Sequence, residues 1–145
     1  MIIRDYESGD RDGLIALWRA CDLVRGWNDP ARDIERKLAL RDDGLLVAVH
    51  GDTLCGSVMA GYDGHRGWIN YLATDPSMRH QGVGRMLVAE AEALLARRGC
   101  PKINLQIRST NAQVAEFYRR IGYVDDDVIS MGKRLVDDEA ASPDG

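Results

Sequence analysis

Apolar side chains three and four positions apart mark four helical segments of the chain. In the first, Leu14, Leu17, Trp18 and Cys21 form one stripe of a helix that ends near Leu23. Turn and cap residues mark the boundaries of the other segments, because they favour helix starts and stops. The other predicted helices cover residues 30–40, residues from the glycine-containing loop to 98, and residues from the cap at 109–111 to 121.

Shorter apolar runs bounded by turn residues predict β-strands. Tight turns at 51–52 and 63–67 join three of them into an antiparallel meander. The strand after the long third helix follows its neighbour through a crossover, so these two strands are expected to be parallel. The predicted strands are residues 1–7, 45–50, 53–62, 68–74 and 103–107, and a last region that begins at Tyr123, turns at Asp125-Asp126-Asp127 and closes the sheet with Val128–Leu135.

These elements predict one domain of the α+β class, residues 1–136, built on a twisted, mostly antiparallel mixed sheet. We expect about six or seven strands and about four helices. The segment 137–145 is small, acidic and contains a proline, so it is predicted to be a flexible tail.

Composition narrows the functional classes. The chain has 145 residues, a net charge of −4 and a pI of about 5.3, so no overall basic field favours nucleic acid. Its three cysteines, Cys21, Cys55 and Cys100, lack the spacing of a metal site and fit a reduced, cytoplasmic protein without a metal cofactor. No apolar run is long enough to cross a membrane.

The loop Arg79–Arg85 carries the clearest chemical signal. Gly82 and Gly84 stand between a predicted strand and the start of a helix, with an arginine at each end of the loop. Free N–H groups and the helix dipole favour an anion there, and glycines let it approach the backbone. A P-loop is excluded because no G-K-[ST] follows, and a dinucleotide fingerprint is excluded because the third glycine is missing. The remaining interpretation is that the loop binds the diphosphate of a ligand, and that the rest of this ligand lies along the preceding strand.

Two motifs give the chain a family resemblance. Arg79-His80-Gln81-Gly82-Val83-Gly84 resembles R/Q-x-x-G-x-G/A, the acetyl-CoA motif of the GCN5-related N-acetyltransferase (GNAT) family. The segment Asn111–Tyr123 resembles the second motif of that family, N-x-x-A-x-x-[FL]-Y-x-x-x-G-[FY]. The resemblance extends over about residues 2–135, and the loop Arg25–Pro30 is similar to that of the YpeA-like bacterial subgroup.

The resemblance implies acetyl-CoA as co-substrate and a fourth strand splayed from the fifth to admit it. Asn111 would hydrogen-bond the cofactor or cap its helix, and Tyr118 would be a core aromatic or would protonate the departing thiolate. N–H groups near Leu72 and Ala73 would stabilise the oxyanion. The residues expected at the cofactor are Leu72, Ala73 and Thr74 along the pantetheine arm, Arg79, Gln81, Gly82, Val83, Gly84 and Arg85 at the pyrophosphate, and Asn111 and Tyr118.

The same resemblance places the acceptor near the first two helices and the ends of the fourth and fifth strands. Trp27 is either a clamp that docks its loop or a pocket wall, and Asp29 and Asp33 could attract an amine. Asp29 is equally suited to cap a helix, and Asp33 to lie on a solvated face. The expected acceptor residues are Trp27, Asn28, Asp29, Asp33, Asn70, Tyr71 and Asn104, with Gln106 beside them.

No general base is identified. Some family members place a glutamate on the fourth strand, and the matching position is about Trp68. Asn70 and Tyr71 could instead hold a water that relays the proton. The sequence therefore predicts an acetyl-CoA-dependent N-acetyltransferase that acts on a primary amine, a small molecule or a protein N-terminus, by direct attack in a ternary complex. The alternative is a non-enzymatic CoA-binding regulatory module. A homodimer is expected because dimers are common in the family.

Overall fold

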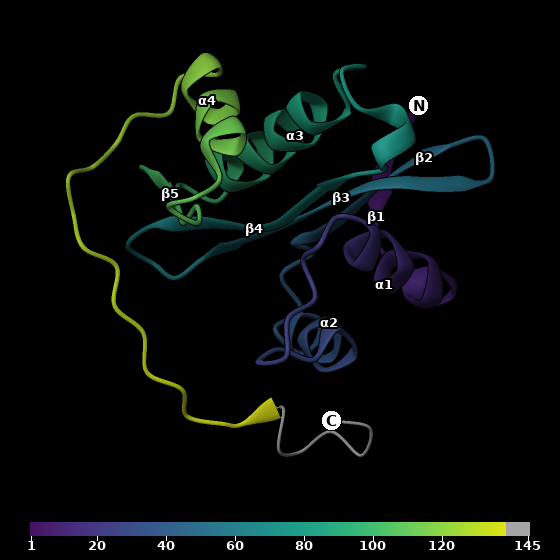
Figure 1. The fold of residues 1–145 in the computed structure, drawn as a ribbon, viewed down its shortest axis with the longest axis horizontal. Helices are drawn as coiled ribbons and strands as arrows, with labels where there is room; N and C mark the ends of the chain where they lie inside the picture. The colour runs from purple at the N-terminus through teal and green to yellow at the C-terminus, as the bar shows by residue number, and fades with distance from the viewer. Residues whose placement is uncertain (139–145) are drawn as a thin grey trace.

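A computed structural model describes residues 1–138 of the chain. Its centre is one five-stranded sheet in the order β1-β2-β3-β4-β5 (Figure 1). Neighbouring strands are antiparallel except β4 and β5, which are parallel as predicted. The strands are β1 (Ile2–Asp5), β2 (Leu45–His50), β3 (Thr53–Tyr62), β4 (Gly67–Thr74) and β5 (Ile103–Leu105).

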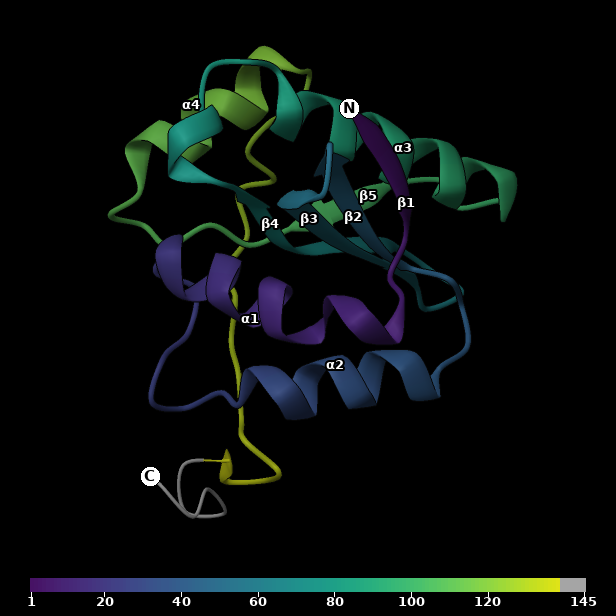
Figure 2. The same ribbon diagram turned by 90° about the vertical axis from the view of Figure 1, so that its right-hand side faces the viewer.

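Helices cover both faces of this sheet. Figures 1 and 2 show α1 and α2 packed on one face and α3 and α4 on the other. The helices are α1 (Arg11–Ala20), α2 (Pro30–Ala39), α3 (Val83–Arg97) and α4 (Ala112–Arg120), with short 3₁₀ turns η1 (Ser8–Asp10) and η2 (Pro76–Met78). The α+β class and the four helices are therefore confirmed. No helix within residues 1–138 is long and apolar enough to span a membrane.

The sheet divides the core into two clusters because β2 is buried on both faces. Leu45 and Val47 pack with the fully buried Trp18 of α1. Leu46 and Ala48 pack against the opposite cluster, which contains Leu87 of α3. Alternate side chains of one strand point to opposite faces, so a continuous apolar run serves both layers. Leu14, Leu17 and Trp18 of the first predicted apolar stripe are all buried in this packing.

β4 and β5 are hydrogen-bonded at one end only. Their register ends at Ile69, which lies opposite Leu105, whereas β4 continues to Thr74. Beyond Ile69 no described strand pairs with this side of β4, as expected for splayed strands, and the Thr74 carbonyl at its end accepts the Cys21 thiol at 3.2 Å. A strand edge of this kind presents N–H and C=O groups that an extended ligand can pair with.

The predicted last strand is wrong. Within residues 1–138 no strand follows α4; the segment after it lies alongside residues 102–106 without strand pairing as far as Ser130 and then crosses toward α2 (Figure 1). Side chains hold it at a distance from β5, through the ion pair of Lys102 with Asp126 and a hydrogen bond from Gln106 to Ser130. Its far end is fixed on α2 through Asp138. The sheet consequently has fewer strands than expected. Of the predicted tail, residues 139–145 lie outside the described residues.

Candidate functional site

The glycine loop forms the N-terminus of α3 as expected. Gly82 is the N-cap and has a left-handed backbone with φ 81°, which a residue with a side chain adopts only with strain. The first intrahelical bond donated after the cap runs from the Met86 N–H to the Gly82 carbonyl at 3.0 Å. The N–H groups before Met86 therefore point out of the helix end, as those of any first turn do. Arg79, Gln81 and Arg85 are exposed around them, while Val83 is buried and anchors the turn.

Gly84 brings this helix end against the end of β4. A Cβ at Gly84 would lie 3.5 Å from Thr74 Oγ1 and 3.5 Å from Phe117 Cζ. The glycine turn, the last residue of β4 and helix α4 thus meet at one point. An anion bound on this turn would lie beside the end of β4.

A β-bulge shapes the edge of β4. Ser57 pairs with Ala73 and Met59 with Asn70, so Tyr71 and Leu72 stand together opposite one residue of β3. Tyr71 has φ 51°, which is uncommon outside glycine. Such a bulge leaves its extra residue unpaired and re-aims the neighbouring groups. Here the bulge lies directly before the buried Ala73.

Ser57 and Trp18 fix this bulge from the core. The fully buried Ser57 hydroxyl donates to the Tyr71 carbonyl at 2.8 Å and accepts the Trp18 indole N–H at 2.9 Å. The Tyr71 ring stacks on Trp18 with centroids 3.8 Å apart and an interplanar angle of 16°. Sequence reasoning did not identify Ser57. Its only signal is a hydroxyl in an otherwise apolar stretch of β3.

Tyr118 lies on α4, in the core cluster that also contains Leu87 of α3. Its side chain is 5% exposed and packs edge-on against Phe117 and Tyr123. Burial raises the pKa of Tyr118 above its usual value, so the phenol stays protonated and can donate. Asn111 caps α4, because its Oδ1 accepts the Val114 N–H at 3.2 Å. Tyr118 and Asn111 line the same cavity beside β5.

A hydrogen-bonded group from three elements lies on the α1–α2 face. The Tyr71 hydroxyl donates to Asp33 at 2.6 Å and accepts from the Asn28 amide at 2.7 Å. Asn28 in turn accepts the Arg25 N–H at 2.7 Å, which fixes the loop before α2. Burial, and then the Asp33 carboxylate, raise the pKa of Tyr71. Three predicted acceptor residues are thus brought together, one residue away from Leu72.

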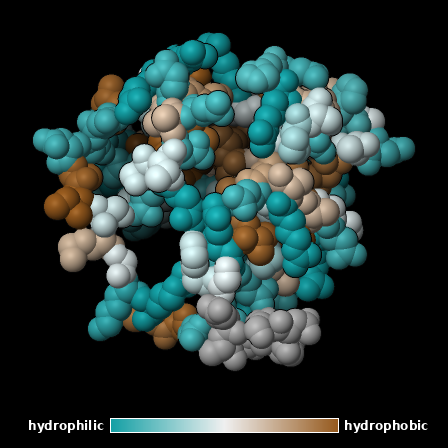
Figure 3. All heavy atoms as spheres, in the orientation of Figure 1, coloured by the Kyte–Doolittle hydropathy of each residue, from teal (hydrophilic) through white to brown (hydrophobic). Residues whose placement is uncertain are grey.

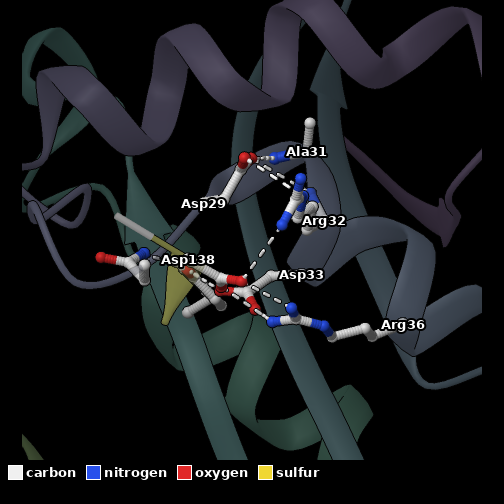
Figure 4. A network of polar contacts seen from close by, with 8 residues as sticks. Asp29, Ala31, Arg32, Asp33, Arg36 and Asp138 are labelled. Atoms are coloured by element: carbon white, nitrogen blue, oxygen red, sulfur yellow. Dashed lines mark hydrogen bonds and ion pairs between the residues drawn. The ribbon is translucent and has the colours of Figure 1, made fainter. Parts of the chain in front are cut away.

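Two arginines of α2, Arg32 and Arg36, lie beside Asp33 and Asp138 (Figure 4). Asp29 is the helix cap and accepts the N–H groups of Ala31 at 3.0 Å and Arg32 at 3.2 Å. Arg36 bridges Asp33 at 3.4 Å and Asp138 at 2.6 Å. Asp33 keeps a partly open carboxylate, with its side chain 24% exposed. Asp29 is exposed to the same extent, at 25%, but its carboxylate caps α2, so Asp33 is the predicted acidic residue that is joined to Tyr71.

The remaining predicted acceptor residues occupy separate places. Trp27 is 44% exposed, and the Arg108 guanidinium lies 5.1 Å from its ring centre, which ties the α1–α2 loop to the chain after β5. Asn70 is exposed on β4. Asn104 lies on β5 in the lining of the cavity beside α4, and its Oδ1 is buried without a hydrogen-bond partner among the described residues. The Asn28, Asp33 and Tyr71 network does not include these three.

At the position where a glutamate was considered as base, Trp68 donates its indole N–H to Asp63 at 3.2 Å. A carboxylate does reach the site from α2, through Asp33. Within residues 1–138 no group of three or more His, Cys, Asp or Glu residues could hold a metal ion.

Comparison with known proteins identifies the family of the chain. Residues 13–123 match the Acetyltransferase (GNAT) family. An acetyltransferase of Pectobacterium atrosepticum is 46% identical over 138 residues, which is 95% of this chain and 98% of the relative. The chain belongs to the GNAT acetyltransferase family, and the resemblance seen in the two motifs is confirmed at that level.

Solved structures show the same fold. Glucosamine-6-phosphate N-acetyltransferase from Arabidopsis thaliana has a TM-score of 0.70 and 26% identity, over 93% of this chain and 98% of that one. The aminoglycoside acetyltransferase AAC(6')-Iy, in complex with a bisubstrate analogue of CoA, has a TM-score of 0.73 and 20% identity, over 92% of this chain and 98% of that one. The second likeness concerns the fold alone.

Proposed function

We propose that this protein transfers the acetyl group of acetyl-CoA to a primary amine by direct attack within a ternary complex. One observation carries the proposal. The side of β4 that is unpaired beyond Ile69 runs from the glycine turn at the start of α3 to the bulge at Tyr71 and Leu72. At this bulge the Tyr71 hydroxyl donates a hydrogen bond to the Asp33 carboxylate. A donor on the edge and an amine at Asp33 would come together at that bulge.

The donor binds through backbone groups. The pyrophosphate of acetyl-CoA accepts N–H groups from Gln81 to Arg85, with Arg79 and Arg85 adding positive charge. The pantetheine arm pairs with Leu72 and Thr74 as a further strand would. The family assignment and the intact Gly82 cap support this placement.

The acceptor binds at Asp33. A cationic amine is attracted to a partly exposed carboxylate, and Asp33 has a side-chain exposure of 24%. Before attack the ammonium must lose a proton. Asp33 accepts it through the Tyr71 hydroxyl, which hands its own proton to Asp33 as it takes one from the amine; the bond of 2.6 Å is in place for that exchange. Trp27 and Asn70 would lie at the rim of this site.

The transfer then needs an oxyanion site and an acid. The amine nitrogen attacks the thioester carbonyl, and the negative charge that develops on its oxygen is stabilised by N–H groups at Leu72 and Ala73. When the C–S bond breaks, Tyr118 donates its proton to the leaving thiolate. Burial raises the pKa of Tyr118, so this proton is present at neutral pH.

A thiol-release assay with acetyl-CoA over a panel of amines and peptides tests the proposal. Amine-dependent release of CoA is expected, with a preference for cationic acceptors that is lost in Asp33→Asn. Calorimetry on the same protein measures acetyl-CoA binding alone. Tight binding without turnover on any acceptor would instead identify a regulatory CoA-binding module. This is the alternative function because position 68 carries a tryptophan and not a carboxylate.

Since Cys21, Cys55 and Cys100 are free thiols in the described chain, the proposal places the protein in the reducing cytoplasm, where acetyl-CoA is available.

A further inference from the structure

The Arg36 guanidinium holds a carboxylate of the chain itself beside the candidate acceptor residues (Figure 4). Arg36 Nη1 donates to Asp138 Oδ2 at 2.9 Å and Nη2 donates to Oδ1 at 2.6 Å, which is the two-bonded fork that a guanidinium forms with a carboxylate. Arg32 adds a second positive charge 3.7 Å from the same carboxylate. The hydrogen bonds from Arg36 hold the pKa of Asp138 below its usual range, so this carboxylate is ionised at neutral pH. With the Asp138 side chain 6% exposed, the two arginines form a nearly enclosed carboxylate site.

The segment that leads to Asp138 is not anchored by packing. Its apolar side chains are exposed, with Met131, Leu135 and Val136 at 90%, 90% and 57%. Figure 3 shows an opening between the body of the protein and the part of this segment that Figure 1 draws at the left. The chain end is therefore held on α2 by charge, through Asp138, and without the burial of apolar surface that normally fixes a segment. A carboxylate bound in this way can be replaced by that of a ligand without loss of core packing.

Arg36 also connects this site with the residues proposed to bind the amine. Its Nη1 lies 3.4 Å from Asp33 Oδ1, and Asp33 Oδ2 accepts the Tyr71 hydroxyl at 2.6 Å. One guanidinium thus contacts two carboxylates, that of Asp33 and that of Asp138. Through Arg36 their nearest oxygens are at most two hydrogen-bond lengths, about 6 Å, apart. An ammonium at Asp33 and a carboxylate in the place of Asp138 would consequently be a few bonds apart in one molecule.

We propose that Arg36, with Arg32 beside it, binds a carboxylate of the acceptor, and that Asp138 occupies this position in the free protein. The acceptor is then a primary amine with a carboxylate a few bonds away, as in a short amino acid or a peptide that begins with an acidic residue. This substrate class rests on the proposed function, because Asp33 is taken as the binding site of the amine.

The exchange keeps Arg36 and Asp33 paired with opposite charges. A carboxylate of the ligand replaces that of Asp138 on Arg36, and the ammonium of the ligand meets Asp33. Asp138 competes with the acceptor from within the same chain, and an attached group of this kind reaches an effective concentration on the order of millimolar. Removing the charge of Asp138 should therefore improve the binding of the acceptor.

Matched acceptors test the proposal in the thiol-release assay. β-Alanine and 4-aminobutyrate are each compared with the corresponding amide, and a tripeptide amide that begins with aspartate is compared with one that begins with asparagine. The members of each pair differ only in whether the carboxylate is present. We expect about tenfold higher kcat/KM for the carboxylate in at least one pair, and that pair identifies the source, a free amino acid or a chain N-terminus. Equal kcat/KM in every pair would overturn the proposal.

Two variants move this preference in opposite directions. Arg36→Gln removes the fork, so the preference for the carboxylate should fall about tenfold. Asp138→Asn removes the competitor, so the KM for the carboxylate acceptor should fall about threefold or more, while that for the amide stays unchanged. Arg120→Gln is the control and should keep the wild-type preference, because Arg120 lies on α4 with a side-chain exposure of 76%. An equal loss for both members of a pair in Arg36→Gln, or an unchanged KM in Asp138→Asn, would show a structural role and overturn the proposal.

Calorimetry separates this subsite from the proposed transfer. Each acceptor is titrated into protein saturated with CoA, which carries no acetyl group to transfer. Tighter binding of the carboxylate than of the amide in wild type, and not in Arg36→Gln, would support the subsite even where no acetylated product forms. Acetylation of both members of every pair, with equal affinities, would leave the transfer in place and overturn the subsite.

Discussion

Replacing Tyr71 with phenylalanine isolates the group that joins the two halves of the site. The change removes the hydroxyl that donates to Asp33 at 2.6 Å and accepts from Asn28 at 2.7 Å. It keeps the aromatic ring that stacks on Trp18, with centroids 3.8 Å apart. The backbone carbonyl of the bulge still accepts from Ser57, so the bulge of β4 is left in place.

The size of the effect follows from these contacts. A hydrogen bond to a charged group contributes about 1.5–3 kcal/mol and one between neutral groups about 0.5–1.5 kcal/mol. The Asp33 side chain is 24% exposed, so water replaces part of the lost bond and the lower values apply. We expect a loss of about 2 kcal/mol in transition-state stabilisation, which is roughly a 30-fold fall in kcat/KM for the amine.

Steady-state kinetics with both substrates varied provides the assay. The loss should fall on the amine, while the Kd for acetyl-CoA measured by calorimetry stays at the wild-type value. Tyr62→Phe is the control, because the Tyr62 hydroxyl makes only an exposed hydrogen bond to the Gly64 carbonyl at 3.3 Å. Unchanged kcat/KM in Tyr71→Phe, or an equal loss in both variants, would refute the role given to this network.

Three further changes test other parts of the site. Gly84→Glu places a side chain 3.5 Å from Thr74 and a negative charge at the anion site, so calorimetry should show acetyl-CoA binding at least about tenfold weaker, with Met86→Glu as an exposed control on the same helix. Tyr118→Phe should lower kcat by about tenfold or more with little change in acetyl-CoA affinity; an equal kcat would make Tyr118 a packing residue. Ser57→Ala leaves the buried Trp18 N–H without its partner, so chemical denaturation should show about 1–3 kcal/mol less stability, and a smaller loss would mean that water takes its place.

Most of the fold was predictable because periodicity and turn chemistry agree with the tertiary packing. β2 and β3 were found at their observed bounds, and the helices within one to three residues. Asp29 and Gly82 carry local signals, a cap before proline and a glycine at a helix start, which do not depend on distant parts of the chain.

The prediction of a last strand was wrong for a physical reason. Val128–Leu135 has the composition of a strand, but pairing is decided by a partner edge and not by the segment itself. Asp126 and Ser130 keep the segment at side-chain distance from β5, and Asp138 holds its end on α2. None of these long-range contacts can be deduced from the composition of the segment.

The candidate site also contains residues that the sequence predicts and residues that it does not. The glycine turn at the start of α3 was predictable because its residues are contiguous. The network of Asn28, Asp33 and Tyr71 could be named only as a set of candidates, because three separate elements converge on it. Ser57 and the bulge at Tyr71 were missed, since a register shift leaves no mark in the hydrophobic pattern.

Transfer of an isotopically labelled acetyl group tests the central claim most directly. The protein is incubated with ¹³C-acetyl-CoA and the best acceptor from the amine panel, and the amine is analysed by mass spectrometry. The account predicts that the labelled acetyl group appears on the amine nitrogen in equal amount to the thiol released. Thiol release with an unlabelled amine would mean hydrolysis, and no release from a protein saturated with acetyl-CoA would mean binding alone; either result contradicts an acetyltransferase built on this site.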